Sequence, residues 1–240
     1  MGCKFCASSL DGFKRNLTAS EMLDQVLYTQ MDLTPPMQGG RRIKNIVVMG
    51  IGEPLDNFDN LMRFIQLVNS KNGLNIGARH MTVSTSGIIE NIDKLAQYDV
   101  QLTLAISLHA PDDDTRSYLM PVNNTAGINA LIEAGKRYYI KTGRRVTYEY
   151  AIIAGINDTP LQAEKLSKII KDTSSHLNLI ILNNIGIGDR KLKPGSAKDS
   201  DKFIGILKKN RVNYTVRRSL GSDIEAACGQ LRRRKLHEMD

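Results

Sequence analysis

The sequence predicts an α/β protein built around one parallel sheet, and three observations lead to that fold class. Short apolar runs rich in Val and Ile alternate with longer segments of helical period along the chain. The runs are nearly continuous in hydrophobicity, as in strands buried on both faces, and repeated strand–helix alternation is typical of parallel sheets. The length of 240 residues, 41% of them hydrophobic, suits one domain with a single core.

Six strands and six helices follow from this pattern, in a sheet that is either open or closed into a barrel. The expected strands are Ile43–Met49, Met81–Ser84, Leu102–Leu108, Val146–Ile153, Leu177–Leu182 and Val212–Val216. The expected helices are Ala19–Met31, Phe58–Ser70, Ile89–Gln97, Ile128–Thr142, Leu161–Asp172 and Ser200–Asn210. The first helix begins at a capping box, with Thr18 as the N-cap and Glu21 three residues later. No strand is predicted before this first helix.

The net charge indicates the class of partner, and the lengths of the apolar runs indicate the compartment. The net charge is +8, and basic residues are dense near the C-terminus, at Arg217, Arg218, Arg232, Arg233, Arg234 and Lys235. Such a surface suits a polyanion, because Lys and Arg neutralise phosphates, although a solvated basic face would have the same composition. No run approaches 18 apolar residues, and the first residues lack a secretion signal, so we expect a cytoplasmic protein.

Cysteine usage points to a metal or redox site. Three cysteines are an odd number, which argues against a disulfide framework. Cys3 and Cys6 form a Cys-x-x-Cys motif, which zinc sites, thioredoxin-type redox pairs and iron–sulfur sites all use. Zinc needs four ligands, and the remaining Cys228 and four histidines show no paired spacing, whereas a thioredoxin-type pair would follow a strand. The motif therefore favours iron–sulfur ligation, with the other two uses left open.

Polar or glycine-rich motifs stand at the ends of successive predicted strands, where parallel α/β folds collect their ligands. They are Gly50–Pro54, Ser84–Gly87, Ser107–Ala110 and Asn183–Asn184. A carboxylate such as Glu53 can hold an ammonium group, although a tight turn alone would explain its glycine neighbours. The hydroxyls of Ser84–Gly87 can bind a ligand or cap the next helix, and a lone histidine such as His109 is more often structural. Their placement at consecutive strand ends favours one shared site.

Taken in order, the segments MGCKFCAS, MGIGEPLDN, TVSTSG, SLHAP and GSDIEAACGQL resemble radical S-adenosylmethionine enzymes, and specifically the RlmN family of adenine-C2 RNA methyltransferases. The resemblance runs from Met1 to about Arg234. The sister family Cfr, which methylates carbon 8, is less similar. The resemblance implies an α/β fold that is a partial (β/α)6 radical-SAM-type barrel lacking its first strand, with residues 1–240 as one core domain.

The same resemblance implies a [4Fe-4S] cluster and S-adenosyl-L-methionine as cofactors. The second and third cysteines of the family's cluster motif match Cys3 and Cys6, and its first would stand two positions before Met1. The family's cofactor-binding positions match Gly52, Glu53, Ser84, Ser107, Leu108, His109 and Asn183. Cys228, which lies among small residues that leave room for a bulky reactant, matches the catalytic cysteine that carries the methyl group as a thioether.

The family also implies partners and an alternative outcome. Its substrates are adenines in 23S rRNA and in tRNA, and an electron donor such as flavodoxin reduces its cluster. Because the family's accessory domain and first cluster cysteine precede the matching region, we expect this chain to be an incomplete form that does not methylate RNA by itself. An inactive basic RNA-binding remnant and a Cfr-like adenine-C8 methyltransferase are the alternatives to the adenine-C2 enzyme.

Overall fold

The computed structural model describes residues 1–9, 12–33, 43–182 and 192–217, and these form an α/β fold on one sheet. The sheet has six strands in the order β1-β2-β3-β4-β5-β6, and every neighbouring pair is parallel. The strands are β1 (Ile46–Val48), β2 (Met81–Thr85), β3 (Thr103–Ser107), β4 (Thr147–Ile152), β5 (His176–Ile181) and β6 (Tyr214–Arg217). The predicted fold class and the six predicted strands are confirmed, although β1 is shorter than the run Ile43–Met49 that predicted it.

The helices follow the strands as the alternation of the sequence predicts. They are α1 (Ala19–Leu33), α2 (Phe58–Asn69), α3 (Ile89–Leu95), α4 (Asp113–Leu119), α5 (Gly127–Thr142), α6 (Pro160–Asp172) and α7 (Ala197–Lys209). Short 3₁₀ turns cover Ala7–Ser9, Pro54–Asn57, Ala78–His80 and Pro121–Thr125. The sequence did not predict α4, which lies between β3 and α5. None of the helices among the described residues is long and apolar enough to cross a membrane.

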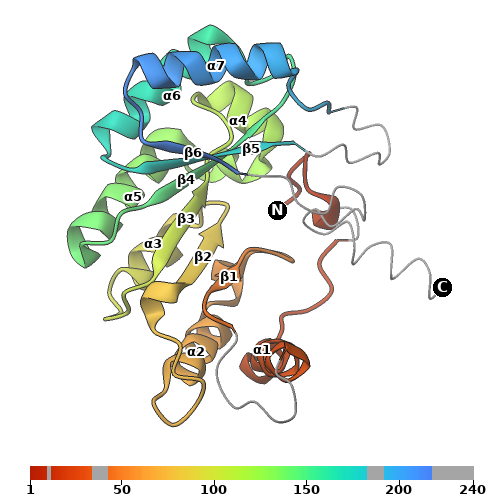
Figure 1. The fold of residues 1–240 in the computed structure, drawn as a ribbon, viewed down its shortest axis with the longest axis vertical. Coiled ribbons are helices and arrows are strands. Elements are labelled where there is room, and N and C mark those ends of the chain that lie inside the picture. Colours follow the sequence, from red (N-terminus) through yellow and green to blue (C-terminus); the bar gives the residue numbers. More distant parts are fainter. Residues whose placement is uncertain (10–11, 34–42, 183–191, 218–240) are drawn as a thin grey trace, which may run out of the picture.

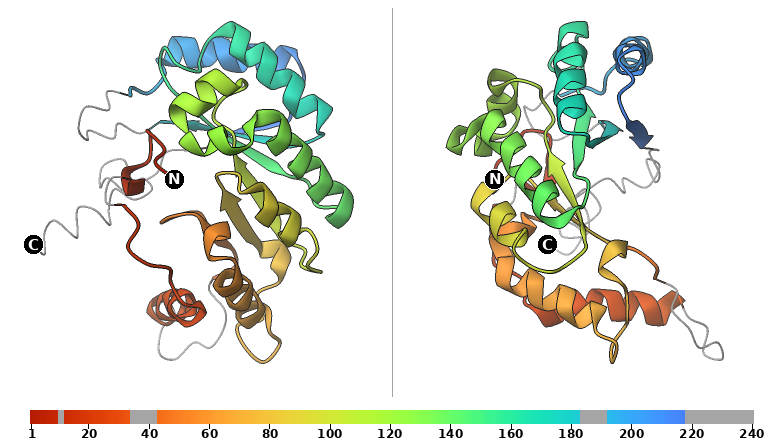
Figure 2. Two further views of the ribbon diagram at one scale, coloured as in Figure 1. Left: turned by 180° about the vertical axis from the view of Figure 1, so that it is seen from behind. Right: turned by 90° about the vertical axis from the view of Figure 1, so that its left-hand side faces the viewer.

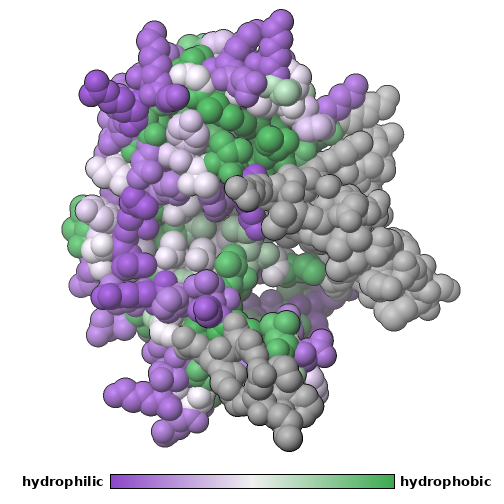
Figure 3. All heavy atoms as spheres, viewed as in Figure 1, coloured by the Kyte–Doolittle hydropathy of each residue, from purple (hydrophilic) through white to green (hydrophobic). Residues whose placement is uncertain are grey.

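Helices cover one face of the sheet, because right-handed crossovers between strands in sequential order all fall on the same side. Figures 1 and 2 show these helices around the outside of the sheet, with α1 lying against α2 at one end. The main core fills the space between this layer and the sheet, and includes Tyr148, Tyr150 and Ile152 of β4. In the space-filling view, hydrophilic side chains gather over the outer helices and hydrophobic ones lie between them (Figure 3).

The opposite face of the sheet, which we call the inner face, carries Ser107, Glu149, Ala151 and Asn178. These residues alternate along their strands with those of the main core, so their side chains stand on the other side of the sheet. The sheet also curves toward closure, since Nη1 of Arg217 at the end of β6 donates to Sδ of Met49 just after β1, at 3.6 Å. Within the described residues β1 and β6 form no ladder, so the barrel is partial.

Candidate functional site

The structure brings most of the predicted site residues to one edge of the sheet. Gly52–Glu53 follow β1, Ser84–Gly87 end β2 and continue beyond it, and Ser107–His109 do the same for β3. We call these three segments together the carboxyl edge, because the strands are parallel and all end there. The prediction that these motifs share one location is therefore consistent with the fold.

Glu53 connects two of the three segments through its carboxylate. Its Oε2 accepts hydrogen bonds from the backbone N–H of Ser86 at 2.6 Å and from the Ser86 hydroxyl at 2.8 Å. Its Oε1 accepts from the backbone N–H of Leu55 at 3.0 Å, which caps the 3₁₀ turn Pro54–Asn57. The Ser86 hydroxyl is also within hydrogen-bonding distance of Met1 Sδ, at 3.4 Å. Sequence reasoning chose Ser84, whereas the serine that contacts Glu53 is Ser86.

Gly52 shows why a glycine stands beside that carboxylate. Its φ is +107°, a backbone conformation that residues other than glycine rarely adopt. A Cβ placed there would meet nothing within 4 Å, so the space beside Gly52 is open. The glycine thus provides an accessible stretch of backbone at the carboxyl edge, which suits close approach by a ligand.

The cysteine pair lies in a tight loop packed on the end of α4. The loop is closed by a hydrogen bond from Cys6 N–H to Cys3 O at 3.2 Å, and Lys4 N–H donates to Leu119 O at 2.9 Å. Cys3 is buried in a small apolar cluster that includes Leu119 of α4 and Ala151 of the inner face. Burial raises the pKa of the Cys3 thiol to about 11, with a further contribution from the nearby Cys6. Cys6 is half-buried.

Two thiols in one tight loop are of the donor type that iron–sulfur clusters use, because such clusters are held by cysteine thiolates. Within the described ranges, no group of three or more His, Cys, Asp or Glu side chains is placed to hold a metal ion. Cys3 and Cys6 therefore fit two positions of the three-cysteine set that the resemblance implies. A bound metal would oppose the raised pKa of the Cys3 thiol, because a coordinating thiol is deprotonated.

His109 is buried at the carboxyl edge and acts there as a neutral acceptor. Its side chain is 4% exposed, and its Nδ1 accepts from the backbone N–H of Ala151 at 2.9 Å. Burial, together with a smaller effect of the charge of Arg116, lowers the pKa of His109 to about 3. The ring also meets Phe5 edge-on, with 4.5 Å between centroids, so it joins the cysteine loop to the end of β3. Leu108 beside it points into the main core and donates its N–H to Glu149 O at 3.0 Å.

Three buried polar residues at this edge were missed by sequence reasoning: Arg116, Asn157 and Glu149. Arg116 on α4 is 2% exposed and donates to the backbone carbonyls of Ser86, just after β2, and of Ser107, the last residue of β3. Asn157 is fully buried, and its Nδ2 donates to the carbonyls of His109 and Ala151, both at 2.7 Å. Sequence patterns gave no signal for them, because each is an isolated polar residue outside any motif.

Glu149 is a carboxylate on the inner face of β4, directly beside Ser107 of β3 in the sheet register. It is 3% exposed, and its Oε1 accepts from Asn178 Nδ2 at 3.2 Å. In the part of the chain that the structure describes, its Oε2 has no hydrogen-bond partner. Burial raises the pKa of Glu149, while Asn178 and the charge of Arg217 act in the opposite direction. A buried oxygen of this kind can accept a donor from a ligand on the inner face.

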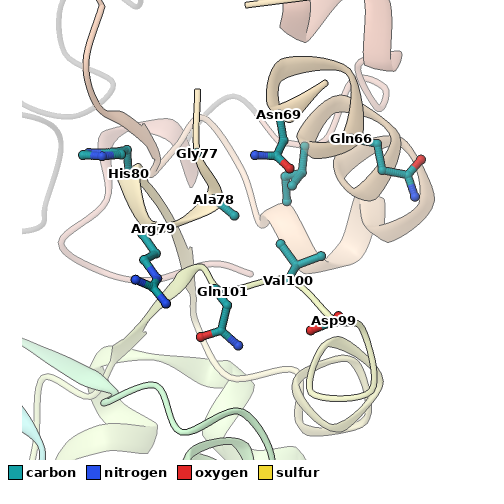
Figure 4. A pocket seen from close by; sticks show the side chains of 10 residues that line it. Gln66, Asn69, Gly77, Ala78, Arg79, His80, Asp99, Val100 and Gln101 are labelled. Atoms are coloured by element: carbon teal, nitrogen blue, oxygen red, sulfur yellow. The ribbon is translucent and has the colours of Figure 1, made fainter. Parts of the chain in front are cut away.

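Two predicted site residues, Asn183 and Cys228, lie outside the described residues, as do the basic positions 218 and 232–235. A separate pocket of about 530 Å³ lies elsewhere, and its lining includes Asn69, Arg79 and Gln101 (Figure 4). Arg79 and Gln101 precede β2 and β3, so this pocket is at the amino ends of the strands, opposite the carboxyl edge. The pocket is therefore not part of the candidate site.

The parallel sheet and the Cys-x-x-Cys loop packed beside its carboxyl edge agree with the family that the sequence profile identifies. The sequence profile of the Radical SAM superfamily matches residues 1–165, and the chain belongs to that superfamily. A solved structure supports the same assignment: a radical SAM methyltransferase from Sphaerobacter thermophilus has a TM-score of 0.89 and 44% identity. That match covers 95% of this chain and 66% of the Sphaerobacter chain.

Among curated relatives, the chain is similar to the probable dual-specificity RNA methyltransferase RlmN. The Clostridium perfringens (strain 13) protein is 50% identical over 233 residues, which are 97% of this chain and 65% of the relative. The Alkaliphilus oremlandii protein is 49% identical over 236 residues, which are 98% of this chain and 66% of the relative. The chain thus spans just under two thirds of the length of the relatives it matches.

Proposed function

We propose that this chain is the catalytic core of a radical S-adenosylmethionine methyltransferase that methylates carbon 2 of specific adenines in 23S rRNA and tRNA. The observation that carries the proposal is the 50% identity to a probable dual-specificity RNA methyltransferase across 97% of this chain. The geometry supports it, because the cysteine loop and three ligand-type segments lie at the same end of the sheet. We also propose the cytoplasm as its compartment and a flavodoxin-type protein as its electron donor.

The cysteine loop and the carboxyl edge would hold different cofactors. Cys3 and Cys6 would hold two irons of a [4Fe-4S] cluster, which supplies the electron that cleaves S-adenosylmethionine. The open backbone at Gly52, the Glu53 carboxylate and the hydroxyls of Ser84 and Ser107 would bind that cofactor, together with Leu108, His109 and Asn183. Cys228 would carry the methyl group, because a thiolate is nucleophilic enough to accept it.

Methylation of carbon 2 of an adenine in RNA places its own requirements on the proposed site. Carbon 2 of adenine lies between two ring nitrogens and is electron-poor, so it cannot take a methyl group by attacking the cofactor. An enzyme must hold the base out of its stack and exclude water from the reacting atoms. The net charge of +8 suits the phosphate contacts needed to hold an RNA there.

The experiment is a domain replacement in the Clostridium perfringens relative. Residues 1–240 of this chain replace the matching region, and the chimera is expressed in a bacterium whose own adenine-C2 methyltransferase gene has been deleted. Mass analysis of nucleosides from 23S rRNA and tRNA is expected to show 2-methyladenosine, and the Cys228→Ala chimera to show none. A folded chimera that leaves the adenines unmodified would refute the proposal, and 8-methyladenosine would replace it with the carbon-8 reaction.

A further inference from the structure

Arg116 is a charged side chain buried without a direct ion pair among the described residues, although the charge of Asp113 acts on it through space. It is 2% exposed, and no described carboxylate forms an ion pair with it. Its guanidinium instead donates to four uncharged oxygens. Nε donates to Leu108 O at 3.1 Å, and Nη1 donates to Asn123 Oδ1 at 2.8 Å. Nη2 donates to Ser86 O at 2.7 Å and to Ser107 O at 2.9 Å.

The acceptors show what this arginine connects. Ser86 O belongs to the loop after β2, and Ser107 O and Leu108 O belong to the end of β3. These are two of the three segments of the carboxyl edge, and no strand ladder continues between them at that point. Ser86 also donates to Glu53, so the third segment is attached to the same network. One guanidinium thus connects all the described segments that we propose as the cofactor site.

The arginine is itself held in place from the side of α4. Asn123, which accepts from Nη1, donates through Nδ2 to Asp113 Oδ1 and to Ser117 Oγ, both at 2.9 Å. Asp113 Oδ1 also accepts from the N–H of Ile128 at the start of α5, at 2.7 Å. The planar fork of an arginine fixes several acceptors in one geometry, which the point charge of a lysine cannot do. The direction of the guanidinium is therefore set by the fold before any ligand is present.

Burying a guanidinium that forms no direct ion pair with a described residue costs free energy, and the charge of Asp113 opposes this cost without cancelling it. An apolar side chain would fill the same space at less cost. Burial lowers the pKa of Arg116 to about 10, so it still carries its charge at neutral pH. Packing alone therefore does not account for an arginine at this position. The specific gain from its fork is the fixed spacing of the loops after β2 and β3.

We infer that Arg116 is a positioning residue for cofactor binding, which holds the loops after β2 and β3 at the spacing that the adenosyl cofactor requires. The inference rests on the proposed function. Arg116 does not touch the cofactor but acts through Ser86 and Ser107. Its loss should loosen both loops together and weaken cofactor binding more than it weakens the fold.

The test uses the full chain, with S-adenosylhomocysteine as the probe and Arg116→Lys as the variant. Amide hydrogen exchange of the ligand-free protein measures how often the two loops open, at residues 84–87 and 107–110. Calorimetric titration measures the affinity for S-adenosylhomocysteine. Because lysine keeps the charge but loses the fork, we expect exchange in both loops to rise and affinity to fall about ten-fold or more. Arg137→Lys is the matched control, because Arg137 donates twice to Asp93 on the outer surface. Its affinity should stay within about two-fold of the parent.

A second variant keeps the inference testable if Arg116→Lys does not fold. Asn123→Ala leaves the arginine in place and removes one of its four acceptors, so a smaller loss of affinity and a rise in exchange at both loops are expected. A folded variant with parental exchange and affinity would overturn the inference. Failure of the parent itself to bind S-adenosylhomocysteine would instead refute the cofactor part of the proposed function. A rise in exchange at both loops in Arg116→Lys would still support the positioning role of Arg116, and unchanged exchange would refute it.

Discussion

His109 gives a pH dependence of stability whose sign and size follow from its burial. Its pKa is lowered from 6.5 to about 3 in the folded protein, because burial disfavours the charged ring. Below pH 6.5 the unfolded chain binds a proton that the folded chain refuses, so stability falls as the pH falls toward 3. The contribution of His109 is fully present above its unfolded pKa and is lost on acidification.

The magnitude follows from linkage at about 1.4 kcal/mol for each pH unit between the two pKa values. Between pH 7.5 and 5.5 the loss due to His109 alone is therefore about 1.4 kcal/mol. Many carboxylates also titrate on acidification, so the parent must be compared with a variant at both pH values. His109→Asn is the matched variant: asparagine can accept from Ala151 N–H as Nδ1 does, and it tolerates the φ of +55° found here.

The assay is urea unfolding at pH 7.5 and pH 5.5, with the free energy obtained by linear extrapolation. At pH 7.5 His109→Asn should be less stable than the parent, because it loses the edge-on contact with Phe5, which is worth about 1 kcal/mol besides the buried ring area. At pH 5.5 the gap should be smaller by about 1.4 kcal/mol. Because desolvation causes the shift, added salt should change this result little. Parallel pH profiles for parent and variant would refute the reasoning.

Three further variants test other buried or capping groups by the same unfolding assay. Glu149→Gln should be more stable than the parent at pH 7, because burial raises the pKa of the carboxyl. The gain should shrink as the pH falls and vanish below the unfolded pKa of 4.5, and a gain that persists well below that pH would contradict this. Asn157→Ala should cost about 3 kcal/mol or more, because it strands backbone groups of His109, Ala151 and Ile153, and a loss below about 1 kcal/mol would show that water replaces the amide. Thr159→Ala should cost about 1 kcal/mol by opening the capping box of α6, and an unchanged midpoint would show that the cap is redundant.

The sheet could be predicted from sequence because each strand lies largely within a short run rich in apolar residues that is separated from the next by a helical segment. The run Met81–Ser84 differs from β2 by one residue, and Leu177–Leu182 is shifted from β5 by one. Helix α4 was missed because the side chains that it buries are Arg116 and Leu119, which give no apolar period. Its only signals were local: Asp112 caps the helix by accepting from Thr115 N–H, and acidic residues follow in the first turn.

That the described candidate motifs share one edge was predictable for a different reason, namely that parallel strands all end there. The contacts at this edge were not predictable, because they depend on loop conformations that no periodicity describes. The bond from Ser86 to Glu53 is one example, since Ser84 and Ser86 have the same hydroxyl and the same setting in sequence. Arg116 is another, since the sequence alone gives no means of distinguishing a buried arginine from a solvated one.

Four of the buried polar side chains among the described residues gather near the carboxyl edge. Arg116, His109, Glu149 and Asn157 are each less than 5% exposed, and they lie at the ends of β2, β3 and β4 or face the inner side of the sheet there. At that edge the ladder stops, so loop carbonyls and N–H groups need side-chain partners instead. Meeting that need fixes the loops before a ligand arrives, which lowers the ordering cost of binding. The burial of these polar side chains costs free energy on folding, and the same side chains preorganise the carboxyl edge for the cofactor that we propose there.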